Sequence, residues 1–196
     1  MKPDLTTLPE LPEGWLWISV DCLISEIETG KSFKCDERPP TGKEIGVVKV
    51  SAVSWGEYDE QESKTCTDPD RMNEALFVRP GDFLFSRANT LELVGACVIA
   101  STVTLRVMLS DKILRFVLVM DDLKRWLLFL LRSEFGRAQI EELASGNQES
   151  MRNIGQECQS ALKIDPPSAS KIECGRARSH VLAGENPAPE GWPAAG

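Results

Sequence analysis

Histidine is almost absent from this sequence of 196 residues, which contains one, His180, in a polar stretch near the C-terminus. A single histidine excludes a zinc site built on several histidines, and it leaves Ser–His or Cys–His catalysis dependent on that residue alone. The six cysteines lie far apart and include no Cys-x-x-Cys pair, the spacing typical of zinc ribbons and thioredoxin-like motifs. We therefore predict reduced thiols in the core or on the surface.

Long apolar stretches are missing too. The longest uninterrupted apolar run, Trp126 to Leu131, is far shorter than a membrane-spanning helix requires. The first residues, Met-Lys-Pro-Asp-Leu-Thr-Thr, lack an apolar segment of signal-peptide length. With 42% hydrophobic and 27% charged residues, the composition is that of an ordinary globular protein of one domain. We expect a cytoplasmic protein that does not bind membranes.

Nucleotide-binding and methyltransferase motifs are also absent. Gly30-Lys31-Ser32 is similar to the end of a phosphate-binding loop, but the first glycine of that motif would stand at position 25, which is Ser25. There is no Gly-x-Gly-x-x-Gly and no Asn/Asp-Pro-Pro-aromatic run. The carboxylates within 59–62 and 121–122 belong to an acidic loop and a helix cap, which disfavours a metal-dependent nuclease. We predict no catalytic, metal-binding or cofactor-binding residue and therefore no enzyme.

Positive charge is scarce overall but concentrated in the middle of the chain. The net charge is −8, yet residues 79–140 carry 9 basic against 6 acidic side chains, while residues 1–78 carry 8 against 16. A local basic face on an acidic protein still releases counterions from DNA. The alternative is that these basic residues form an ordinary solvated surface. The charge distribution therefore permits DNA binding of modest strength.

The hydrophobic pattern predicts an α/β (α+β) fold: a mixed, mostly antiparallel twisted sheet packed with one main helical segment. Apolar residues recur at the helical period from Leu123 to Phe135, with an interruption at Gly136 and a second stretch to Ala144. Asp21 is predicted to cap a short helix over 23–27, and Asp68 a helical turn over 70–75. Strands are predicted at 47–53, 76–79, 83–86, 93–99, 102–107, 113–119 and 161–164.

The most informative stretch runs from Arg79 to Gly95. Pro80-Gly81 has the residues of a type II turn, and an apolar strand follows it. The strand ends in Ser86, Arg87, Ala88, Asn89 and Thr90, which present a guanidinium, an amide and two hydroxyls. Such groups suit base edges and phosphate oxygens. The segment predicts a surface that holds a ligand without breaking it.

Each candidate contact has an expected role. Arg87 suits guanine, and Asn89 or Gln148 suits adenine, because these pairings are bidentate. The residues expected to contact phosphate and set position are Ser86, Thr90, Lys31, Ser32, Lys49 and Arg115. Alternatives remain open: Arg87 in a salt bridge with Asp82 or Glu92, Asn89 as a turn residue, and Gly146-Asn147-Gln148 as the end of a helix.

Five segments, in order and with domain-like spacing, together resemble a target recognition domain of the DNA-specificity subunit of type I restriction–modification systems. The match covers roughly residues 8 to 167. The segments are Leu11–Trp17, Gly46–Val53, Gly81–Gly95, Ser110–Arg115, and the stretch from Gly146 through Asn153-Ile154 to Leu162–Pro167.

The resemblance implies sequence-specific recognition of one half of a bipartite site in double-stranded DNA. It also implies modification (methyltransferase) and restriction subunits as partners. S-adenosylmethionine, ATP and Mg are then expected only in those partners, with no cofactor in this chain.

The tail, residues 168–196, departs from the family, which carries a coiled-coil spacer after the Pro-Pro pair. Residues 168–184 show no sustained heptad pattern. We expect a poorly ordered tail and a chain that is monomeric alone. Pro187–Trp192 is similar to Pro9–Trp15, so the tail is either the start of a lost second repeat or a chance likeness. The alternative function is a truncated remnant of a specificity subunit without useful DNA binding.

Overall fold

The computed structural model describes residues 10, 13, 17–54, 56–68, 70, 72–148, 151–155 and 162–164. The predicted tail at 168–196 lies outside these residues. This includes its repeat-like segment and residues 168–184, which lack the heptad pattern of a coiled coil. Most of the predicted opening segment Leu11–Trp17 also lies outside them.

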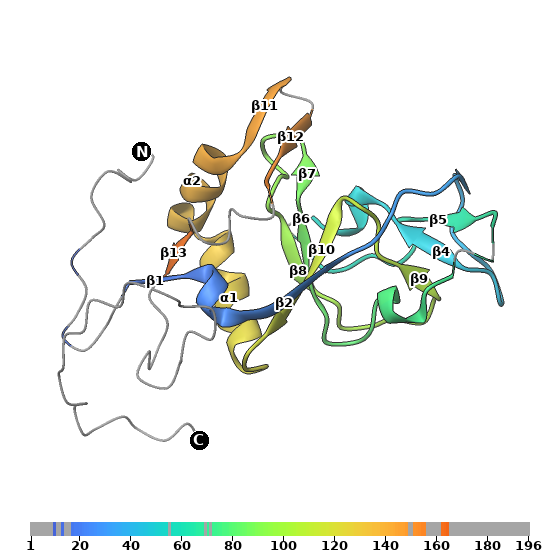
Figure 1. The fold of residues 1–196 in the computed structure, drawn as a ribbon, viewed down its shortest axis with the longest axis horizontal. Helices are drawn as coiled ribbons and strands as arrows, with labels where there is room; N and C mark the ends of the chain where they lie inside the picture. The colour runs from blue at the N-terminus through green and yellow to red at the C-terminus, as the bar shows by residue number, and fades with distance from the viewer. Residues whose placement is uncertain are drawn as a thin grey trace.

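A four-stranded antiparallel sheet forms the centre of the molecule (Figure 1). Its order is β2-β10-β6-β8, and β10 pairs with both β2 and β6, so that Leu114 lies opposite Thr29 on one side and Phe85 on the other. Side chains alternate between the two faces of a strand, and in β6 all four are buried, so both faces are covered there, whereas the edge strand β2 is partly exposed. The strands are β2 (Ile24–Thr29), β10 (Ile113–Leu118), β6 (Phe83–Ser86) and β8 (Cys97–Ile99).

Two helices cover one face of the central sheet. Phe83, Phe85 and Phe116 form stacked ring pairs there and pack with the apolar side of both helices. Ser133 separates the helices: its hydroxyl accepts a hydrogen bond from the Gly136 N–H and so caps the second one. The helices are α1 (Leu123–Arg132) and α2 (Glu134–Leu143).

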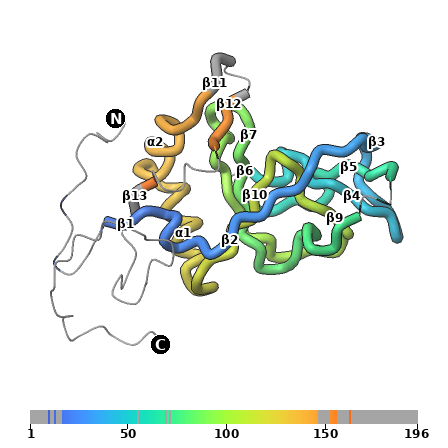
Figure 2. Tube along the Cα trace, in the orientation of Figure 1, coloured from blue at the N-terminus to red at the C-terminus, as the bar shows by residue number. Residues whose placement is uncertain are grey.

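A second four-stranded sheet covers the opposite face. Leu84, Val98 and Ile113 of the central sheet pack against it and against nearby loops. Figure 2 shows the chain passing along β2 from the helical side to this second sheet. Its order is β3-β5-β4-β9, with β4 and β9 parallel. The elements are β3 (Cys35–Asp36), β5 (Ser63–Cys66), β4 (Gly46–Val48), β9 (Val107–Met108) and the 3-10 helices η2 (Val50–Ala52) and η4 (Glu74–Leu76).

Small sheets complete the fold. A hairpin rises beyond the end of α2 and adds a short strand from the predicted recognition segment, in the order β11-β12-β7. Two further strands pair antiparallel beside the helices, β1 with β13. These elements are β11 (Ser145–Gln148), β12 (Met151–Asn153), β7 (Ala88–Asn89), β1 (Ile18–Ser19), β13 (Lys163–Ile164) and the 3-10 helix η1 (Val20–Leu23).

The predicted fold class is confirmed, and so are the strands at 83–86 and 113–119 and the main helical segment. The type II turn residue Gly81 has φ 87°, as a glycine at that position should. The predicted strand at 93–99 is shorter than expected, and of the one predicted at 102–107 only Val107 is strand, as the first residue of β9. Residues before Cys97 form a turn, in which Thr90 O accepts from the N–H groups of Leu93 and Val94.

Other local predictions were wrong at their boundaries. The predicted helix over 23–27 is instead the end of η1 followed by β2, because Ile24 and Ile27 pair with β10. The helical break lies at Ser133 and not at Gly136. Within the helical turn predicted at 70–75, Asp70 is 3-10 helical, residues 72–73 are not, and a separate 3-10 turn, η4, begins at Glu74, where Asn73 Oδ1 accepts a hydrogen bond from the Ala75 N–H. Residues 146–148 are strand and do not end the helix.

Candidate functional site

Three chain segments from the centre of the sequence and its first third meet at one end of the central sheet. Strands β2 and β6 both run antiparallel to β10, so their last residues lie beside the first residues of β10. The Arg87 N–H donates to Lys112 O at 3.0 Å, and the Gly30 N–H donates to Ser110 O at 3.2 Å. We call residues 30–32, 86–90 and 110–112 the sheet-end surface.

Gly30 permits the closest of these approaches. A Cβ atom at this position would lie 1.7 Å from Leu109 O and 3.0 Å from the Ser110 nitrogen. Any side chain there would push the chain carrying Lys31 and Ser32 away from the start of β10. The glycine thus places two predicted phosphate-contacting residues next to a segment about 80 residues later in the sequence, since Ser32 Oγ donates to Asp111 Oδ1 at 2.5 Å with a separation of 79 residues.

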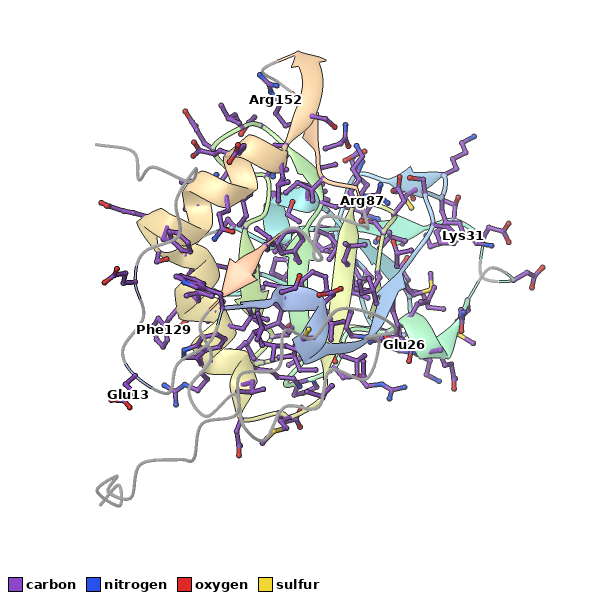
Figure 3. All side chains as sticks on the ribbon, turned by 60° about the vertical axis from the view of Figure 1, so that its left-hand side comes forward. Glu13, Glu26, Lys31, Arg87, Phe129 and Arg152 are labelled. Atoms are coloured by element: carbon purple, nitrogen blue, oxygen red, sulfur yellow. The ribbon has the colours of Figure 1, made fainter. Side chains whose placement is uncertain are left out.

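The predicted base-reading residues lie on the same surface. Arg87 is half-buried, and its guanidinium makes no hydrogen bond or ion pair with any other described residue. Its carbonyl accepts from the Ile154 N–H at 2.8 Å, which fixes the backbone. Asn89 is also half-buried and lies in β7 instead of the turn considered for it; its Oδ1 accepts from the Thr90 N–H. Figure 3 shows Arg87 and Lys31 on the side of the molecule away from Phe129 of α1.

Two contacts from α2 and β12 hold this segment in place. Arg137 of α2 donates to Val94 O at 2.6 Å and to Leu91 O at 3.1 Å, which anchors the turn that follows β7. Strand β12 pairs with β7, so that Arg152 lies opposite Asn89. Base-reading side chains need a rigid backbone beneath them, and these contacts supply it. Arg152 adds a basic side chain that the sequence analysis did not select.

Two of the predicted phosphate contacts are corrected. Arg115 is buried, with its residue 6% exposed, and its guanidinium is paired with Glu28 and with Asp82, the latter at 2.9 Å. It also donates to Phe77 O at 2.8 Å and Ala75 O at 2.6 Å. Burial by itself would lower the pKa of Arg115, but the hydrogen bonds to the two carboxylates raise it, so the group stays charged. Ser86 is fully buried. Neither side chain is available to a phosphate.

Arg115 also takes the partner that was considered for Arg87. Asp82 accepts from Arg115 and from the Arg79 N–H, and it forms no ion pair with Arg87. The structural salt bridge therefore exists, but it belongs to the arginine on β10. Gln148 lies in β11, and its side chain falls outside what the structure describes.

A cavity of about 430 Å³ opens beside the sheet-end surface, between the β2–β3 loop, β4 and the turn before β10. Ser32 and Lys49, two predicted contacts, line it together with residues that the sequence analysis did not select. The full lining is Ser32, Phe33, Cys35, Glu37, Val47, Val48, Lys49, Val50, Ser51, Lys64, Ser110, Asp111 and Lys112.

The charges around the cavity are unevenly paired. Lys64 forms an ion pair with Glu37 at 2.5 Å, and this hydrogen bond lowers the pKa of the Glu37 carboxyl. The ammonium groups of Lys49 and Lys112 make no hydrogen bond or direct salt bridge with a described residue, although the charge of Lys49 also contributes to the lowered pKa of Glu37. Lys112 was missed because it precedes β10 in the sequence, and only the antiparallel pairing places it beside Arg87. The only feature of the sequence that could have identified Lys112 is its position within the family-like segment Ser110–Arg115.

Other chemistry finds little support in the described part of the chain. It contains no group of three or more histidine, cysteine or carboxylate side chains able to hold a metal ion, and no helix long and apolar enough to cross a membrane. Cys35, Cys66 and Cys97 are free thiols, as predicted, and burial raises the pKa of Cys97 to about 12. Cys22 departs from the prediction because it is disulfide-bonded.

Known proteins with the same fold and related sequence supply the remaining observation. The specificity subunit of the type I restriction enzyme EcoEI from Escherichia coli is 34% identical over 167 residues, which are 84% of this chain and 28% of that protein. The crystal structure of a type I restriction–modification S subunit from M. genitalium aligns over 80% of this chain and 36% of its own, with TM-score 0.50 and 15% identity.

The HsdS subunit from Thermoanaerobacter tengcongensis aligns over 81% of this chain and 34% of its own, with TM-score 0.43 and 17% identity. No protein-family model matches the chain. The resemblance inferred from the five segments is confirmed: this chain is similar, over most of its length, to about a quarter to a third of type I specificity subunits. The relatives are specificity subunits, in agreement with the prediction that the chain is not an enzyme.

Proposed function

We propose that this chain, a relative of part of the type I restriction–modification specificity subunits, is a target recognition domain that binds double-stranded DNA and recognises one half of a bipartite sequence. The observation that carries the proposal is the position of Arg87 and Asn89. They lie on one surface with Lys31, Ser32, Lys49 and Lys112, although these residues come from distant parts of the sequence. Sequence-specific binding needs this combination of base-reading and phosphate-contacting groups.

The residues divide into two roles. Arg87 reads guanine through two parallel hydrogen bonds, because its guanidinium has no described partner that competes for it. Asn89 contacts adenine through its amide. Thr90, Lys31 and Lys49 contact phosphates and set the position of the domain on the duplex, while Ser32, whose hydroxyl donates to Asp111, holds its loop against the start of β10. The acidic remainder of the chain limits the affinity and disfavours unspecific binding.

The rest of the assembly follows from the relatives and is part of the proposal. The chain itself has no catalytic role, and methylation and cleavage are performed by separate modification and restriction subunits that bind S-adenosylmethionine, ATP and Mg. The chain alone is a monomer in the cytoplasm. Sedimentation of the isolated protein tests the monomeric state.

Selection of bound duplexes from random-sequence DNA tests the central claim. A short selected motif, the length of one half-site, is expected. Affinity for the selected duplex should fall with salt, with a log–log slope that corresponds to about 3 to 5 neutralised phosphates. Binding without any enriched sequence, or no binding at all, would instead favour a truncated remnant that recognises no DNA.

A matched pair of variants makes the test specific to the surface. Arg87→Ala removes a base-reading group, whereas Arg125→Ala removes the same charge from the exposed side of α1, one helical turn from the exposed Phe129. Only the first should relax the selected sequence. Equal effects of the two variants would contradict the assignment of the interface.

A further inference from the structure

We infer that the cavity beside the sheet-end surface is a phosphate-binding site, formed by Ser110, Lys49 and Lys112, which holds a backbone phosphate of DNA next to the base contacted by Arg87. The assignment to DNA rests on the proposed function, whereas the affinity for phosphate rests on the cavity alone.

The cavity wall contains a buried hydroxyl without a hydrogen-bonding partner. Ser110 lines the cavity, its residue is 8% exposed, and its Oγ forms no hydrogen bond in the described part of the protein. Buried polar groups are nearly always paired, and an unpaired hydroxyl in a cavity wall indicates an acceptor that arrives with a ligand. A phosphate oxygen is such an acceptor, and it leaves the hydroxyl able to donate.

The ammonium groups of Lys49 and Lys112 favour a negatively charged ligand. Lys49 on the β4 side and Lys112 before β10 both line the cavity and form no direct salt bridge with a described residue, although the charge of Lys49 contributes to the lowered pKa of Glu37. The carboxylates of the lining are already engaged: Glu37 binds Lys64, and Asp111 accepts from Ser32. The lining contains three lysines and two carboxylates, so its net charge is one positive charge. Lys64 is neutralised by Glu37, which leaves Lys49 and Lys112 against Asp111. The cavity therefore favours an anion.

The size of the cavity argues for a phosphate attached to a larger group. A volume of about 430 Å³ lies in the range of sites that hold an organic ligand, and Val47, Val48 and Val50 supply an apolar wall. A sugar phosphate fits this combination of an apolar wall with cations. Two sources share that chemistry, a phosphodiester of DNA and the phosphate of a free nucleotide.

Continuity with the base-reading residues favours DNA. The Arg87 N–H donates to Lys112 O, so the backbone of the cavity wall is bonded directly to that of the base-reading segment. A duplex whose base edge meets Arg87 therefore carries its sugar–phosphate backbone past Lys112. A free nucleotide bound in the cavity has no neighbouring base pair that would contact Arg87.

The first arm of the test measures the salt dependence of DNA binding. The double variant Lys49→Gln/Lys112→Gln should lower the log–log slope by about one, as expected for one phosphate contact, and weaken binding equally for all sequences. Arg125→Gln removes a charge from α1 and should leave the selected sequence and binding nearly unchanged. Ser110→Ala should weaken binding without changing the base preference, and circular dichroism checks that each variant is folded.

The second arm needs no DNA. Inorganic phosphate and a deoxynucleoside monophosphate are titrated into the ¹⁵N-labelled protein while the amide resonances of Ser110 and Lys112 are followed. Shifts in the wild type that disappear in the double variant support the site. If DNA does not bind but these shifts occur, the proposed function fails and the phosphate site stands, with a free nucleotide as its source.

The remaining outcomes are equally distinct. A lower slope without shifts from the free ligands supports a site that needs the phosphodiester of a duplex. An unchanged slope together with absent shifts overturns the phosphate site while DNA recognition stands. Neither DNA binding nor shifts would overturn both.

Discussion

Two arginines at neighbouring positions of the same sheet differ in their environment: Arg115 is buried and ion-paired, whereas Arg87 is half-buried and unpaired among the described residues. Arg115 lies in the middle of β10, covered by the second sheet, and four acceptors surround its guanidinium. Arg87 lies just past the end of β6, and its guanidinium has no partner in the described part of the chain. The difference shows that position along a strand, and not residue type, decides whether an arginine is structural or available to a ligand.

The cause is the pairing of the strands. The antiparallel register of β10 with β2 places Glu28 directly opposite Arg115, and the turn before β6 adds Asp82. Beyond the strand ends the pairing stops, and the charged side chains of the sheet-end surface are three basic ones and a single carboxylate, Asp111. Interior charges are thus neutralised within the fold, while charges at the sheet end remain available for binding.

The largest expected effect is the loss of stability on Arg115→Met. Removing one partner of a buried pair leaves uncompensated charge, here on Glu28 and Asp82, and costs roughly 3–5 kcal/mol. Denaturant unfolding measures it. Arg125→Met on α1 is the control and should stay within about 0.5 kcal/mol of the wild type. A stable Arg115→Met protein would mean that the ion pairs are not structural.

Arg87→Ala should show the reverse pattern. Unfolding free energy should change by no more than about 0.5 kcal/mol, because no described partner is lost. Specific DNA binding should weaken by roughly 1–3 kcal/mol, with relaxed preference at one base pair. Competition binding with duplexes altered at single positions measures this. The comparison of the two arginines fails if Arg87→Ala destabilises the fold as much as Arg115→Met.

A smaller effect, on the pH dependence of stability, is expected from the Glu60 carboxylate. Burial alone would raise the pKa of Glu60, but hydrogen bonds from Thr104 Oγ1 and from the Leu105 and Thr104 N–H groups lower it below its ordinary value of 4.5. A lowered pKa contributes stability above the unfolded value, and this contribution is lost as the pH falls through the folded pKa.

Glu60→Gln should therefore flatten the loss of stability below about pH 4.5, relative to the wild type, in thermal unfolding measured across acidic pH. The same slope in both proteins would show that these hydrogen bonds do not favour the charged carboxylate. Glu57→Gln is a matched control in the same loop, since Glu57 is exposed.

The smallest effect concerns thiol reactivity at the cavity. Burial and the neighbouring Cys66 raise the pKa of Cys35, which lines the cavity. Because the thiolate is the reactive form, iodoacetamide should label Cys35 slowly at neutral pH and faster as the pH rises. Bound duplex DNA should slow labelling further. Cys97, fully buried, serves as the internal unreactive control by mass spectrometry.

Local pattern was sufficient for part of this fold. Phe83–Ser86 and Ile113–Leu118 alternate between two buried faces, and the leucines after Asp122 recur at the helical period, so these elements were predictable. The break between the helices was predicted at Gly136, because glycine commonly interrupts a helix. It lies instead at Ser133, whose hydroxyl caps the second helix. The hairpin of β11 and β12 was missed, since its residues carry little alternation and pair with β7 only through tertiary contacts.

For the candidate site, the amino-acid sequence alone determined which chemical groups are present, that histidine-based or motif-based catalysis is disfavoured, and that Ser86 to Thr90 end a buried strand. Only the tertiary structure decided which groups are accessible. It buried Ser86 and Arg115, and it brought Lys112, Ser110 and Lys49 to one cavity beside Arg87. The physical reason is that accessibility and ion pairing depend on strand register between segments distant in sequence, whereas propensity and periodicity report only on neighbours along the chain.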